Sequence, residues 1–374
     1  MDDALRRDGS PAPGSPRQRT PWKTVGGRVI SLVSRKGGVG KTTSAVNIGA
    51  ALALSGHTVL IVGVDPQCGV CRTLGHGPHD LPCGLQDVFG GAPLADLALL
   101  SPLDDLHFVS PRILELADEE AYLGAMADHA SVFVAAIDRA RALYDTILID
   151  CPPNLGPATR AALLAADGYL VPVQAEELCR ESVEPLLEFV DTFRERTQPD
   201  AAPGGPGALV LDGLFLTMVN GRTRMARHVC DQLGDDYGDL VLATAVPRTT
   251  RLSEMALRGK PAVIYDRRSA GSRAYFDLAD ELVNRYCSGT GPDDSLVEAM
   301  LGSMTRSLGA QRPTREATAD SDFDSLVLQD GPHSPEMVSL DDLLAEEESG
   351  QGRDEDDWEE GYWTGDLGGP SRLN

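Results

Sequence analysis

The 374-residue chain lacks any apolar stretch close to the roughly 20 residues that a membrane-spanning helix needs. Its N-terminus also lacks the apolar core of a secretory signal peptide. Cysteine is sparse, and the seven residues are an odd number scattered along a long chain, which argues against a disulfide framework and for a reducing compartment. We therefore expect a cytoplasmic protein rather than a membrane protein or a disulfide-stabilised secreted domain.

Positive charge is also scarce, because 57 acidic residues outnumber 33 basic ones and the formal net charge is −24. The deficit is uneven: the net charge is +2 over 1–23, −10 over 24–290 and −16 over 291–374. Both terminal segments have few apolar residues, which is the composition of disordered chain. We predict a disordered N-terminal arm over 1–23, a folded domain over 24–290, and an acidic, largely disordered tail over 291–374. Since most of the acidity lies in the tail, it does not argue against nucleic-acid binding by the domain.

One stretch dominates the central part: an apolar run at 29–33, the sequence KGGVGKTT at 36–43, and an Ala-rich amphipathic run at 44–54. A strand, a glycine-rich turn and a helix in this order are typical of a phosphate-binding loop, in which backbone N–H groups and the helix N-terminus converge on phosphate oxygens. The alternative is a plain turn between strand and helix. Under the first interpretation Lys41 reaches the β- and γ-phosphates and the Thr42 hydroxyl binds Mg²⁺. The predicted nucleotide-binding residues of the loop are Lys36, Gly37, Gly38, Val39, Gly40, Lys41, Thr42 and Thr43.

Two aspartates follow apolar runs that read as buried strands. Asp65 comes shortly after the run at 57–62, and Asp150 directly follows the run at 144–149. A carboxylate at the C-terminal end of a parallel strand beside the loop can orient water or Mg²⁺. We predict that Asp150 binds Mg²⁺ through water. Asp65 is predicted to align the water that attacks the γ-phosphate, with metal contact as a second role.

The K-G-G-x-G-K-T-T pattern resembles the deviant phosphate-binding loop of the ParA/MinD family of ATPases; Arg35 stands at the first glycine position of the usual loop. The Asp-Cys-Pro-Pro at 150–153 is similar to the ParA form of the Walker B motif, and residues 247–254 match the family's P-R-x-x-R-L-x-E at each position. The resemblance covers 29–286. It implies that Lys36 crosses a dimer interface to the nucleotide of a second subunit, so that ATP binding and homodimer formation are linked. The family has Asp where this chain has Gly63, which leaves the details of water positioning open.

The same resemblance implies how the base and DNA are bound. The segment 217–223 is similar to the family's T-M-x-D-x-R-T, with Asn220 in place of the acidic residue. Asn220 would hydrogen-bond the adenine edge or, alternatively, form an Asn-Gly turn, and Pro247 would pack near the base. Arg222 and Arg251 match DNA-contact positions of the family. Further cations in these segments, which either extend a basic edge or pair with neighbouring carboxylates, are Arg224, Arg227, Arg248, Arg258 and Lys260.

Cysteine and histidine gather at 68–83, where Cys68, Cys71, His76, His79 and Cys83 invite a zinc interpretation because Cys-x-x-Cys is a common ligand half. The other half lacks a standard ligand spacing, and the ParA family holds no metal here. We treat these residues as a loop without zinc.

The order of apolar runs and amphipathic segments predicts an α/β fold, with a doubly wound, mostly parallel sheet flanked by helices, of the P-loop NTPase type. With the resemblance, it predicts an ATP- and Mg²⁺-dependent ATPase whose ATP-bound dimer binds DNA non-specifically on the nucleoid. A ParB-like partner would stimulate hydrolysis during chromosome or plasmid segregation. The alternative is a ParA-like ATPase that positions a non-DNA cargo or acts as a scaffold. A nitrogenase-reductase-like redox ATPase is disfavoured, because no motif matches its two cluster-binding cysteines.

The acidic tail contains short acidic-apolar pieces at 323–328 and 337–344 and two of the three tryptophans. These are either incidental or a docking motif for a tail-binding protein. The tail is not a basic amphipathic helix, so no membrane partner is expected.

Overall fold

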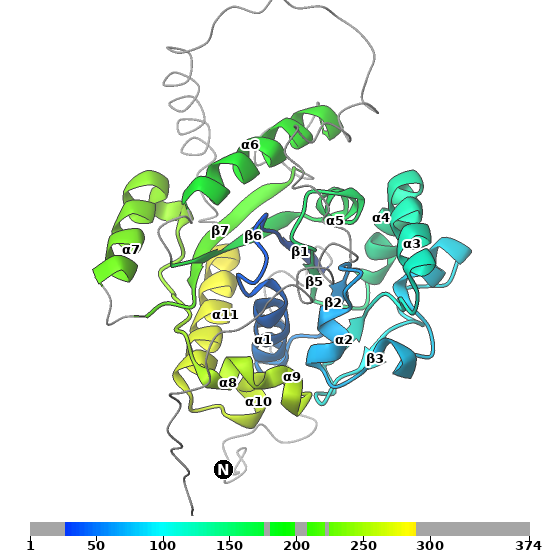
Figure 1. Ribbon diagram of the computed structural model, residues 1–374, viewed down its shortest axis with the longest axis horizontal. Coiled ribbons are helices and arrows are strands. Elements are labelled where there is room, and N and C mark those ends of the chain that lie inside the picture. The colour runs from blue at the N-terminus through cyan, green and yellow to red at the C-terminus, as the bar shows by residue number, and fades with distance from the viewer. Residues whose placement is uncertain (1–26, 176–179, 199–207, 221–223, 289–374) are drawn as a thin grey trace, which may run out of the picture. The chain divides into compact units, whose positions relative to one another are not determined.

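The computed structural model describes residues 27–175, 180–198, 208–220 and 224–288 (Figure 1). The predicted arm at 1–23, the tail at 291–374 and Arg222 lie outside these residues. The strands are β1 (Arg28–Leu32), β2 (Val59–Gly63), β3 (Leu99–Leu100), β4 (Leu106–Val109), β5 (Thr146–Asp150), β6 (Gly168–Gln174) and β7 (Val210–Thr217). The longer helices are α1 (Lys41–Leu54), α3 (Leu116–Asp128), α4 (Ala130–Ala140), α5 (Pro157–Ala165), α6 (Arg180–Thr197), α7 (Arg224–Tyr237) and α11 (Ala270–Ser288). Four short helices are α2 (Gly69–Thr73), α8 (Thr250–Ser253), α9 (Met255–Arg258) and α10 (Ala262–Tyr265).

The strands form one sheet in the order β3-β4-β2-β5-β1-β6-β7. All pairs are parallel except β3 with β4, at the edge. This confirms the predicted fold class. The central strands are continuous apolar runs rather than alternating ones because helices bury both faces of a parallel sheet.

Each face of the sheet carries its own apolar core, because successive strand side chains point to opposite sides. In β1, Val29 belongs to the core under α3 to α7, whereas Ile30 belongs to the core under α1, α2, α10 and α11. In Figure 1, α1 and α11 lie side by side over the second face. Ser44 of α1 and Tyr275 of α11 join their hydroxyl groups at 3.0 Å inside this core.

The structure differs from the sequence pattern in three places: the helical pattern from Pro111 to about Leu143, the apolar run at 241–246, and the loop expected at 68–83. The long helical pattern up to residue 143 is two helices, α3 and α4, which meet at His129 because its non-helical backbone (φ −125°, ψ 31°) ends one and begins the other. The run at 241–246 is not a strand; only isolated bridges pair Leu214 with Val241 and Val219 with Pro247. The predicted loop after Cys68 contains the helix α2.

No helix of the described ranges is both long enough and apolar enough to cross a bilayer. The feature that matters for the site is the position of β1 between β5 and β6. The phosphate-loop sequence leaves β1 at the same sheet edge where β5 delivers Asp150, and Leu32 is in register with Asp150. Residues far apart in the chain therefore meet at the carboxyl ends of the strands, where open α/β sheets bind ligands.

Candidate nucleotide site

The loop between β1 and α1 depends on two glycines with left-handed backbone. Gly38 has φ +75° and Gly40 has φ +93°, and Gly40 is the residue that caps α1. Only glycine adopts these angles without strain. The loop is also tied to the end of β7, because the Thr217 hydroxyl donates a hydrogen bond of 2.9 Å to the carbonyl of Val39. Sequence reasoning did not single out Thr217 as a support of the loop.

Lys41 points back into the loop. Its Nζ donates hydrogen bonds to the carbonyl oxygens of Ser34 at 3.4 Å and Lys36 at 3.2 Å. Burial lowers the pKa of Lys41, and the nearby Asp150 opposes that shift. A buried ammonium group enclosed by a glycine-rich loop is the arrangement that favours a bound phosphate.

Thr42 and Asp150 face each other directly, with the Thr42 hydroxyl donating to Oδ2 of Asp150 at 2.6 Å. Asp150 is fully buried, and burial raises its pKa from 3.8 to about 7. Its Oδ1 is buried without a hydrogen-bond partner among the described residues. A hydroxyl and a carboxylate with a spare oxygen are the ligands that Mg²⁺ prefers, so these two residues fit the predicted ion.

Asp65 lies at the same edge. Burial has the largest effect on the pKa values of Asp150 and Lys41. The negative charge of Asp65 is close enough to raise both pKa values as well. The Oδ1 of Asp65 accepts the backbone N–H of Gln67 at 2.9 Å, which holds the carboxylate in the turn before α2. The structure therefore brings Lys41, Thr42, Asp65 and Asp150 together, as the sequence predicted, while their roles stay predictions.

The neighbours of Gly63, which stands where the ParA family has Asp, crowd the place where a side chain would begin. A Cβ atom on Gly63 would lie 3.1 Å from the Ser110 hydroxyl and 3.1 Å from a methyl group of Val70. Val70 belongs to α2, and a Cβ on Gly69 in the same helix would lie 3.1 Å from the Thr42 hydroxyl. Helix α2 thus packs on both the strand end and the predicted metal ligand, and no spacing in the sequence revealed this contact.

The two residues predicted to contact the base are adjacent. Val219 and Pro247 form a parallel bridge, and the N–H of Arg248 donates to the carbonyl of Val219 at 3.1 Å. This pairing places Asn220 beside Pro247 at the end of β7. Asn220 is exposed and Pro247 is partly exposed.

The cysteines at 68–83 are held by backbone groups. The Cys68 sulfur lies 3.2 Å from the carbonyl of Pro66 and 3.1 Å from that of Pro111, and the Cys71 sulfur lies 3.1 Å from the carbonyl of Cys68. The His76 ring packs against Phe108. Over the residues that the structure describes, no group of three or more His, Cys, Asp or Glu side chains is arranged to hold a metal.

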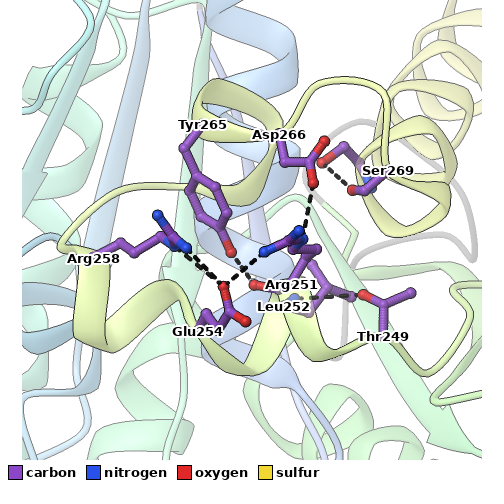
Figure 2. A network of polar contacts seen from close by, with 9 residues as sticks. Thr249, Arg251, Leu252, Glu254, Arg258, Tyr265, Asp266 and Ser269 are labelled. Carbon is purple, nitrogen blue, oxygen red and sulfur yellow. Dashed lines mark hydrogen bonds and ion pairs between the residues drawn. The ribbon is translucent and has the colours of Figure 1, made fainter. Parts of the chain in front are cut away.

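Four of the predicted DNA-contact cations lie around α8 to α10. We call Arg248, Arg251, Arg258 and Lys260 the basic edge; all four are exposed. Arg251 pairs with Glu254 at 3.2 Å and with Asp266 at 3.0 Å (Figure 2). Arg248 and Lys260 form no ion pair with any residue in the described part of the chain. Arg258 pairs with Glu254 as well, at 3.0 Å, whereas Arg248 and Lys260 remain open to other anions. Contact of these cations with DNA stays a prediction.

Comparison with known proteins places this geometry in a family. Residues 27–202 match the family model described as "AAA domain". The chain is 35% identical over 257 residues to the sporulation initiation inhibitor protein Soj of Bacillus subtilis, covering 68% of this chain and 98% of Soj. It is 37% identical over 262 residues to the chromosome partitioning protein ParA of Caulobacter vibrioides, covering 69% and 94%.

A solved structure agrees with these relatives. The cobyrinic acid a,c-diamide synthase of Mycobacterium smegmatis, with bound ADP and magnesium, superimposes with a TM-score of 0.57 at 33% identity, over 70% of this chain and 96% of that one. Residues 27–202, which match the family model, hold strands β1 to β6, the glycine-rich loop and both aspartates. The chain belongs to the ParA/MinD family of P-loop ATPases.

Proposed function

We propose that this protein is a ParA-type ATPase that binds ATP with Mg²⁺, dimerises, and in that form binds DNA without sequence preference. The observation that carries the proposal is the convergence of Lys41, Thr42 and Asp150 at one sheet edge. The bound ADP and magnesium of the similar solved structure support the choice of ligand. The chromosome partitioning relative supports the choice of process.

The proposed chemistry is transfer of the γ-phosphoryl group to water, which needs mostly positioning and charge neutralisation. The loop amides and Lys41 hold the phosphates, and Thr42 and Asp150 hold Mg²⁺, which supplies positive charge to the phosphate oxygens when it is bound. Asp65 aligns the attacking water at the turn where Gln67 restrains its carboxylate. Asn220 and Pro247 contact the base.

Dimerisation in this proposal depends on Lys36. This lysine lies at the start of the loop and is partly exposed. Its carbonyl oxygen accepts a hydrogen bond from the ammonium group of Lys41. Its side chain extends to the nucleotide of the second subunit, as the deviant loop implies. ATP then favours the dimer because only the dimer lets both lysines meet phosphate.

The experiment measures particle mass by light scattering and DNA binding by anisotropy, each with and without ATP and Mg²⁺. We expect ATP to double the mass and to induce binding of a random-sequence duplex. Lys36→Ala should abolish both effects, and Arg251→Ala should weaken only DNA binding. Arg35→Ala, which removes the neighbouring exposed cation, and Arg139→Ala on α4 are the matched controls. An unchanged mass with ATP would refute the proposal.

A ParB-like protein that stimulates hydrolysis and releases the dimer from the nucleoid completes the proposed cycle. A pull-down with the Asp65→Ala dimer as bait tests this partner, since slow hydrolysis should keep the dimer intact. Recovery of a centromere-binding protein supports segregation of a chromosome or plasmid.

The second candidate is a ParA-like ATPase that positions a non-DNA cargo or acts as a scaffold through its tail. One observation favours it: Arg251, a predicted DNA contact, is already paired with Glu254 and Asp266. It predicts the same ATP-dependent dimer without DNA binding, so the anisotropy measurement separates the two candidates.

A further inference from the structure

Two arginines of the basic edge share a single carboxylate oxygen. Oε2 of Glu254 accepts a hydrogen bond from Nη1 of Arg251 at 3.2 Å, and two from Arg258, from Nε at 3.2 Å and Nη2 at 3.0 Å. Figure 2 shows both guanidinium groups turned toward this carboxylate. The spacing explains the contact, because residues three before and four after Glu254 lie on the same side of a helical segment.

The carboxylates of this network cancel the charge of the two arginines. Asp266 adds a second contact to Arg251, at 3.0 Å from its Nε. With Glu254 and Asp266 ionised, Arg251 and Arg258 contribute no net charge to the surface. The remaining positive charge of the basic edge then comes from Arg248 and Lys260.

The two arginines stay open to a competing anion. Their side chains are 46% and 50% exposed, and ion pairs between exposed side chains are weak enough to exchange for a phosphate. A polyanion such as nucleic acid offers many phosphates to the same surface, so competition with one carboxylate is effective.

Each arginine also has a support other than Glu254. Arg258 lies over the ring of Tyr265, with its guanidinium carbon 4.9 Å from the ring centre. The Arg251 side chain is held by Asp266, and the backbone carbonyl oxygen of Arg251 accepts a hydrogen bond from the Tyr265 hydroxyl. Removal of the Glu254 charge therefore leaves both cations in place on the surface. A variant without the Glu254 charge can therefore show whether Glu254 neutralises these cations or holds them in position.

We propose that Glu254 is an electrostatic brake on the basic edge, competing with nucleic-acid phosphates for Arg251 and Arg258. Arg258 is thereby a phosphate-contact residue alongside Arg251. This brake rests on the proposed function and adds a way to regulate it. DNA phosphates must displace the Glu254 carboxylate before they contact the two arginines, and this displacement lowers the affinity for DNA. The ATP-bound dimer can then be released readily, because the carboxylate recaptures both cations.

The test uses the full chain with ATP and Mg²⁺ and measures its affinity for a random-sequence duplex by anisotropy. Glu254→Gln keeps the side-chain shape and removes the charge. We expect about 3- to 10-fold tighter binding, with a steeper dependence on salt between about 50 and 200 mM. Glu120→Gln, on an exposed face of α3, changes the net charge equally and should leave the affinity unchanged. Glu254→Met, uncharged and of similar length, serves if the Gln variant fails to fold.

Arg258 provides the second arm. In the double variant Glu254→Gln with Arg258→Gln, the gain in affinity should fall, because one of the released cations is gone. The brake is overturned if Glu254→Gln binds DNA only as tightly as Glu120→Gln, or more weakly than the wild type. In that case ATP-dependent DNA binding by the wild type still upholds the proposed function. Absence of ATP-dependent DNA binding by the wild type overturns both.

Discussion

Gly63 has no side chain where the ParA family has Asp, and neighbouring side chains pack close to it. Val70 and Ser110 crowd the place where a side chain would begin, since each has an atom 3.1 Å from the point where a Cβ on Gly63 would lie. The sequence revealed the departure from the family pattern. It did not reveal the compensation, because Val70 reaches Gly63 only through the packing of α2 on β2.

Restoring the family residue by Gly63→Asp should therefore destabilise this protein. We expect a loss of about 1–3 kcal/mol in the free energy of unfolding, because added atoms in a packed core force neighbours apart. Urea denaturation measures it. Gly63→Asp with Val70→Ala should recover part of the loss, and Gly90→Asp, in open space, is the matched control. Equal stability of Gly63→Asp and wild type would show that α2 moves freely at this strand end.

Asp150 should make the stability of the nucleotide-free protein depend on pH. Its folded pKa of about 7 lies above its ordinary 3.8, because burial favours the neutral carboxyl group. The folded state therefore holds a proton that the unfolded state has lost, and this contribution to stability is present at low pH and disappears as pH rises through about 7.

The measurement is the difference in Tm between wild type and Asp150→Asn across about pH 4 to 8, a range that spans the ordinary value of 3.8 and the folded value of about 7. Wild type should lose stability relative to Asp150→Asn as pH rises, and Asp96→Asn, at an exposed position, should show no such trend. Parallel curves for wild type and Asp150→Asn would contradict the prediction.

Among the helices, α1 is joined to α9 and α10 by one buried amide. Nδ2 of Asn47 donates to the carbonyl of Thr43 at 2.7 Å and approaches the sulfur of Met255 at 3.0 Å. Its Oδ1 accepts the N–H of Val263 at 3.3 Å. The helix that follows the phosphate loop is thereby linked to α10 and to α9, which carries Arg258 of the basic edge.

Asn47→Ala should loosen this link by leaving the N–H of Val263 buried without a partner. We expect a destabilisation of about 1–3 kcal/mol. Amide hydrogen exchange should rise first over 255–265, since local opening follows the loss of local contacts. Ser44→Ala, on the same helix, should instead affect α11 through Tyr275. A uniform rise over the whole domain after Asn47→Ala would contradict a local role.

Most elements could be predicted from the sequence, because an apolar run of five or six residues between turn residues is a strong strand signal. The exceptions have physical causes. The break at His129 depends on a single non-helical residue between two helix-forming stretches. The run at 241–246 has strand composition, yet only single bridges form there, and Glu281 instead accepts the N–H groups of Ala243 and Thr244 at 2.7 and 3.0 Å.

Over the full chain, the uneven charge predicts an effect of the tail on DNA binding. We expect a tethered segment of net charge −16 to compete with DNA phosphates for the cations of the basic edge. Truncation after Ser288 should raise the DNA affinity at low salt, and the gain should shrink as salt screens the tail. Anisotropy titrations at two salt concentrations check this, with full-length protein as reference. The same affinity with and without the tail would exclude the competition.

The sheet, the phosphate loop and the candidate residues Lys41, Thr42, Asp65 and Asp150 could be inferred from the linear chain, because strand periodicity and the spacing of Gly, Lys, Thr and Asp are local properties. The support of the loop by Thr217 and the packing of α2 beside Thr42 could not. Which arginines pair with carboxylates depends on the tertiary structure. Arg251 and Arg258 share Glu254 through helical spacing, but Asp266 joins them only because α10 folds back beside α8. Likewise Asp150 meets Thr42 through strand order. Contacts between distant segments arise from packing, and a linear pattern does not record them.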